Sequence, residues 1–124
     1  MEVRALHPPP EIMQKIIPII LIFLGEGLAI YSEIVAAKNI NTFAATFWKM
    51  SGVMTLAGLL LIAGYMFGLK YLNNIWIVGV VSIGGIIIME PVITYLLFQE
   101  FPSRGALIGL VLGILGLLSA LFIK

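Results

Sequence analysis

The chain has 124 residues, of which 61% are hydrophobic and 10% are charged, and its formal net charge is +1. A soluble domain of this size needs many more polar residues to cover its surface, so a water-soluble fold is excluded. The near-neutral charge argues against nucleic acid as a partner. Cysteine is absent, and no cluster of His, Asp or Glu has the spacing of metal ligands. We therefore expect neither a metal site nor a cofactor.

Four long apolar stretches follow one another along the chain. Each is close to the roughly 20 residues that a helix needs to span a hydrocarbon core about 30 Å thick. None shows the short apolar–polar alternation that is typical of membrane strands. We predict an all-α, polytopic membrane protein whose single domain, 1–124, has four transmembrane helices in a plasma or inner membrane. The predicted helices cover residues 12–37, 42–69, 75–98 and 103–123.

The connections between these stretches are short and lie at 38–41, 68–74 and 99–104. Short connections make consecutive helices antiparallel neighbours, which predicts an up-down-up-down bundle with both termini on one side. Pro102 and Ser103 are suited to begin the last helix.

The residues before the first helix are expected to form a polar arm, extended around Pro8–Pro10, in which His7 is solvated. Basic residues near segment ends set the orientation of a membrane protein. The terminus side has Arg4, Lys15, Lys70 and Lys124, and the opposite side has Lys38, Lys49 and Arg104. This small excess favours cytoplasmic termini and leaves insertion in both orientations open.

Glu26 lies in the middle of the first apolar stretch. At about 1.5 Å of rise per residue it is roughly 15 Å from the terminus-side end, near the membrane midplane. No basic residue shares its depth, and burial disfavours the charged form of a carboxyl group. Such a group can bind either a proton or a cation, which is the minimum requirement for proton-coupled exchange. The alternative is a protonated structural acid that is hydrogen-bonded between helices.

Glu33 follows Glu26 by almost two helical turns, so the two acids are expected to share a face. Glu90 and Lys49 reach a depth similar to that of Glu33, which suggests that Lys49 forms an ion pair in a cluster with the two acids. This cluster is either structural or shapes a cavity or its gate, because charges within a membrane mark pathways. Pro91 follows Glu90 directly and can open a kink that lines a substrate site, or a kink without a ligand.

The last stretch has no charge between its two ends but carries four glycines. They fall within an arc of about 80° at 100° per residue, which forms a face of small residues that a second backbone can approach closely. The face packs either inside the bundle or against a second chain, and we favour the second chain. These glycines are Gly105, Gly109, Gly113 and Gly116.

The segment "FQEFPSRGALIGLVLGILG" resembles the end of the EamA-type repeat of the drug/metabolite transporter superfamily. Glu100, followed by Gly109 and Gly116, is similar to its acid-loop-helix pattern, and "MEPV" is similar to the Glu-Pro of its penultimate helix. The length, the four helices and the acid in the first helix resemble the small multidrug resistance proteins. That resemblance implies a dimer in which Glu26 binds both the proton and a cationic substrate.

We therefore expect a small transporter, not an enzyme, in which Glu26, Glu33 and Glu90 bind the proton or the substrate and Lys49 and Pro91 support them. Its partners would be the lipid bilayer, a small solute, and a second copy (possibly antiparallel) or a similar four-helix chain. One alternative is a subunit that moves a lipid-linked sugar or another lipid headgroup between leaflets. The other is an assembly protein that transports nothing.

Overall fold

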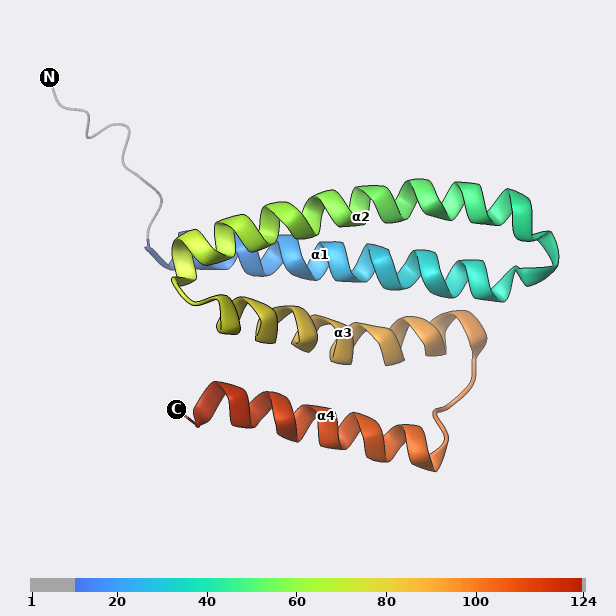
Figure 1. The fold of residues 1–124 in the computed structure, drawn as a ribbon. Helices are drawn as coiled ribbons and strands as arrows, with labels where there is room; N and C mark the ends of the chain where they lie inside the picture. The colour runs from blue at the N-terminus through green and yellow to red at the C-terminus, as the bar shows by residue number, and fades with distance from the viewer. Residues whose placement is uncertain (1–10, 124) are drawn as a thin grey trace, which may run out of the picture.

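The computed structural model describes residues 11–123, and every regular element in this range is a helix (Figure 1). Each of the four α-helices is long and apolar enough to cross a membrane, which confirms the predicted all-α fold and makes the protein a multi-pass membrane protein. The predicted arm with His7 lies outside the described residues. The elements are α1 (Glu11–Lys38), the 3-10 helix η2 (Ile40–Thr42), α2 (Phe43–Leu72), α3 (Ile75–Phe98) and α4 (Arg104–Phe122).

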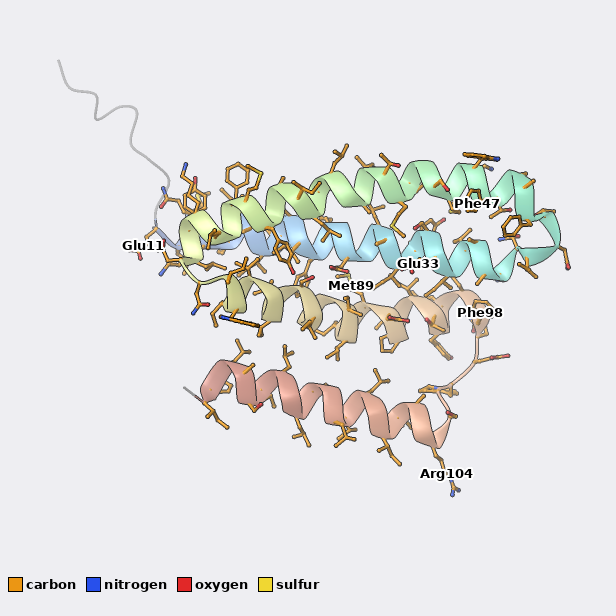
Figure 2. All side chains as sticks on the ribbon, viewed as in Figure 1. Glu11, Glu33, Phe47, Met89, Phe98 and Arg104 are labelled. Carbon is orange, nitrogen blue, oxygen red and sulfur yellow. The ribbon has the colours of Figure 1, made fainter. Side chains whose placement is uncertain are left out.

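Consecutive helices run in opposite directions, as the short connections predicted (Figure 1). The start of α1 and the end of α4 lie at one end of the molecule, which we call the terminus-side end. The α1–α2 and α3–α4 connections lie at the other, the loop-side end. Figure 2 places Glu11 at the terminus-side end and both Phe47 and Arg104 at the loop-side end.

The helices α1 and α2 form the most extensive contact in the molecule. Glycines allow it: a Cβ built on Gly64 would lie 2.7 Å from Ile22 Cγ1 and 3.1 Å from the Ile22 backbone nitrogen. A Cβ built on Gly25 would lie 2.7 Å from Leu61 Cγ. Ile22 and Ala57 are completely buried at this contact. The two backbones come this close because no side chain separates them.

Helix α3 packs along α1 and meets α2 near the terminus-side end. There a Cβ on Gly68 would lie 2.9 Å from Cγ2 of the fully buried Val78. The sequence predicted that α2 ends near Leu69, but the helix continues to Leu72. Asn73, with φ 59°, ends α2 by donating its N–H to the Leu69 carbonyl. Asn74 then caps α3 by accepting hydrogen bonds from the first backbone N–H groups of that helix.

Helix α4 lies on the outer side of α3 and packs chiefly against it (Figure 1). It begins as predicted, because the Ser103 side chain accepts a hydrogen bond from the Ala106 N–H at 3.2 Å. No residue of α4 is buried. The fold is therefore a three-helix core with a fourth helix attached to one side, and the bundle is open along α4.

Candidate functional site

The centre of the candidate site is the carboxyl group of Glu26, which is buried where α1 meets α3. Glu26 is only 8% exposed, and its Oε1 accepts a hydrogen bond of 2.6 Å from the hydroxyl of Ser82 on α3. Ser82 is itself only 7% exposed. The salt bridge that the structure gives among residues 11–123 is Lys15–Glu11, so Glu26 has no basic partner there. A hydroxyl and not a cation thus meets the carboxyl group, whereas the sequence predicted only the absence of a basic partner.

The surroundings of this hydrogen bond are apolar. Phe23 precedes Glu26 by one turn of α1, and its ring lies against Gly85 of α3, where a built Cβ would be 3.5 Å from Phe23 Cδ1. Met89 lies two turns beyond Ser82 on α3 and packs against Gly27, with its sulfur 3.0 Å from a Cβ built there. In such surroundings a carboxylate has few groups that can stabilise its charge, so each polar contact matters more than it would in water.

The two carboxyl oxygens of Glu26 are not equivalent. Ser82 holds Oε1, whereas no residue between 11 and 123 makes a hydrogen bond to Oε2. Within the same range, no fully buried side-chain oxygen lacks a partner. It follows that Oε2 is not completely enclosed, so Ser82 holds one oxygen and the other makes no hydrogen bond with the described residues.

The predicted ion pair between Lys49 and Glu33 or Glu90 is wrong for the described residues. All three side chains are exposed and face different surroundings. Glu33 borders a small hollow between α1 and α2 with Met50, and its position above α3 can be followed in Figure 2. Equal depth in the membrane does not bring side chains together, because the direction in which each leaves its helix also matters.

Glu90 and Pro91 do lie together, in a cavity of about 540 Å³ between α3 and the start of α4. Helix α3 continues through Pro91 to Phe98, so the proline does not end the helix. A second acid, Glu100, lines the same cavity from the α3–α4 connection. The remaining lining residues are mostly apolar, with one hydroxyl: Ile86, Ile87, Thr94, Phe101, Pro102, Ala106, Gly109 and Leu110. Glu26 is not among them.

The glycine face of α4 is divided between two environments. Gly113 faces α3, where a built Cβ would be 3.2 Å from Ile87 Cδ1, and Gly109 lines the α3–α4 cavity. A Cβ on Gly105, Gly109 or Gly116 would meet no atom within 4 Å. One glycine of the four therefore serves contact within the chain, and the others leave room for something outside it.

Two residues of the site were not singled out from the sequence. Ser82 is an ordinary polar residue in an apolar helix, and the one signal nearby is Gly85, where a built Cβ would lie 3.5 Å from Phe23 Cδ1 of α1. Glu100 was noted for the resemblance alone, although it shares a cavity with Glu90. No group of three or more His, Cys, Asp or Glu side chains that could hold a metal ion occurs in the described part of the chain.

Comparison of the chain with protein-family models, with curated protein sequences and with solved structures found no match. The fold and the site by themselves define the class: a multi-pass membrane protein with four long helices and a buried acid between α1 and α3.

Proposed function

We propose that the protein is a small transporter of the cell membrane that exchanges a proton for a small solute at Glu26. The observation that carries this proposal is the burial of Glu26 with a serine hydroxyl as its partner and without a basic group. A carboxyl group in this position changes its charge when it gains or loses a proton. A cationic or amine-bearing solute can take the place of that proton, which couples the two movements.

A second copy of the chain, or a similar four-helix chain, fits the same proposal. The three packed helices leave little room for a solute that must be reached alternately from both sides. Helix α4 has no buried residue and open space beside Gly105 and Gly116. Helix association in a bilayer depends on close packing at small residues. The resemblance of the C-terminal segment to the drug/metabolite transporter superfamily supports the same arrangement.

The experiment is transport by the full chain reconstituted in liposomes under an imposed pH gradient, with labelled tetramethylammonium and tetraethylammonium as probes, because these permanently charged cations do not cross a bilayer unaided. Liposomes with the wild-type protein should accumulate at least one probe, and Glu26→Gln should lower this uptake by a factor of about 100 or more, a usual size for loss of a proton-transfer group. Glu11→Gln is the matched control, because Glu11 forms an exposed salt bridge with Lys15 outside the site. Proton-driven uptake by Glu26→Gln would contradict the proposal.

A lipid-translocating subunit is the second candidate, and the α3–α4 cavity favours it. This cavity is open beside a helix that packs chiefly on α3, and it presents carboxylates of Glu90 and Glu100 next to apolar walls. Such a groove suits a lipid headgroup with an amine and its attached chain. Movement of fluorescent phosphatidylethanolamine between leaflets, unaffected by the pH gradient and by Glu26→Gln, would support this candidate over the exchanger.

A further inference from the structure

The hydroxyl group of Ser82 is the one polar group of the described residues that is hydrogen-bonded to Glu26. Its donor–acceptor distance of 2.6 Å is typical of hydrogen bonds from a hydroxyl to a carboxylate. Both side chains are more than nine-tenths buried, so solvent does not replace this contact easily. Hydrogen bonds to a charged acceptor favour the charged form, and the effect is larger in apolar surroundings.

We propose that Ser82 is a positioning residue that holds Oε1 of Glu26 and thereby leaves Oε2 as the atom that exchanges a proton for a cation. This inference rests on the proposed function of Glu26. When the carboxyl group is charged, Ser82 donates to Oε1 and lowers the cost of the buried charge. When a proton arrives, it binds at Oε2, the oxygen that is not completely enclosed, and it returns to water from there as the solute cation approaches.

No charged or titratable group of the described residues contacts the carboxyl group of Glu26 in the way that Ser82 does. On the helices packed around Glu26, the nearest such groups along the chain are exposed or make no hydrogen bond or ion pair with it in residues 11–123. They are Tyr31 and Glu33 on α1, Lys49, Tyr65 and Lys70 on α2, and Glu90 on α3. Ser82 is therefore the side chain among the described residues that contacts the carboxyl group of Glu26 through a hydrogen bond.

The test is the pH dependence of Ser82 variants, measured in two ways on the full chain. The first is proton-driven tetraethylammonium uptake in liposomes, and the second is a ¹³C NMR titration of labelled glutamate, in which Glu26→Gln assigns the signal. Ser82→Ala should displace the midpoint of both curves from the wild-type value, because the side-chain donor to the carboxyl group of Glu26 is lost. Ser82→Cys, which is similar in size but a weaker donor, should give a smaller shift in the same direction.

Ser32→Ala is the matched control. Ser32 is 1% exposed on α1, but its hydroxyl donates to the Ala29 carbonyl of its own helix and does not touch Glu26. Its midpoint should stay at the wild-type value. An unchanged midpoint in Ser82→Ala and Ser82→Cys would overturn the inference, and so would an equal shift in Ser32→Ala.

Failure of this inference and failure of the proposed function give different results. If Glu26→Gln abolishes proton-driven uptake while the Ser82 variants titrate like the wild type, the exchanger stands and the positioning role falls. If Glu26→Gln transports normally, the exchanger falls whatever the Ser82 variants do. Should Ser82→Ala not yield a monodisperse protein, the Ser82→Cys titration decides alone.

Discussion

The α1–α2 pair and α4 are built from similar apolar residues, yet the residues between α1 and α2 are closely packed whereas those of α4 are exposed. Between α1 and α2, glycines on each helix face large side chains on the other, and residues such as Ile22 and Ala57 are completely buried. On α4, no residue is buried and most of the glycine face meets open space. A glycine in a membrane helix is therefore not in itself a sign of contact within the chain. A matching surface must be present as well.

The largest effect should come from filling the α1–α2 contact. Gly64→Leu places a side chain where a Cβ already comes within 2.7 Å of Ile22, and the Ile22 backbone cannot move aside. We expect the free energy of unfolding to fall by about 3 kcal/mol or more, as for overpacked cores. The measurement is unfolding in mixed micelles with increasing sodium dodecyl sulfate.

Gly58→Leu is the control for this prediction, because a Cβ at Gly58 on the same helix meets nothing within 4 Å. Gly58→Leu should unfold like the wild type in the same mixed-micelle assay. Similar losses in both variants would mean that helix propensity and not the contact with Ile22 is responsible.

On α4 we expect a glycine substitution to affect the folding of the single chain less and its association with a second chain more. Gly116→Leu should leave the unfolding of the single chain nearly unchanged, since a Cβ there meets no atom within 4 Å. It should weaken association by about tenfold or more if a second chain packs on this face, because close approach is lost. Energy transfer between two differently labelled copies in liposomes measures this association.

Ile114→Ala is a suitable comparison, because residue 114 leaves α4 on the side opposite the glycines at 100° per residue. It should associate like the wild type. Undiminished association of Gly116→Leu would show that copies of the chain meet elsewhere. Loss of association in both variants would implicate α4 as a whole and not its glycine face.

The smallest effect concerns the cap that begins α3. The Asn74 side chain accepts hydrogen bonds from the N–H groups of Trp76 at 2.9 Å and Ile77 at 3.4 Å. Asn74→Ala should lower the free energy of unfolding by about 1 kcal/mol, the usual cost of losing such a cap. Asn74→Asp keeps an acceptor and should unfold like the wild type in the same micelle assay. Equal stability of Asn74→Ala would mean that packing alone fixes the start of α3.

Much of the architecture followed from the sequence. Four apolar stretches of membrane length predicted four helices, and their short connections predicted the antiparallel order, because both depend on local composition and chain length. Ser103 was identified correctly as the start of the last helix, since capping involves neighbours in the sequence. The end of α2 was placed too early, because the helix runs to Leu72 and ends at the left-handed backbone of Asn73.

The sequence alone placed Glu26 in the middle of the first apolar stretch and predicted that no basic residue shares its depth. Only the tertiary structure decided that Ser82 is its partner, that Lys49 pairs with neither Glu33 nor Glu90, and that Glu90 shares a cavity with Glu100. The physical reason is that distance along a helix follows from residue number, whereas the direction of each side chain relative to another helix depends on how the helices rotate and pack. That rotation is set at α1–α2 and α1–α3 by contacts spread over many residues.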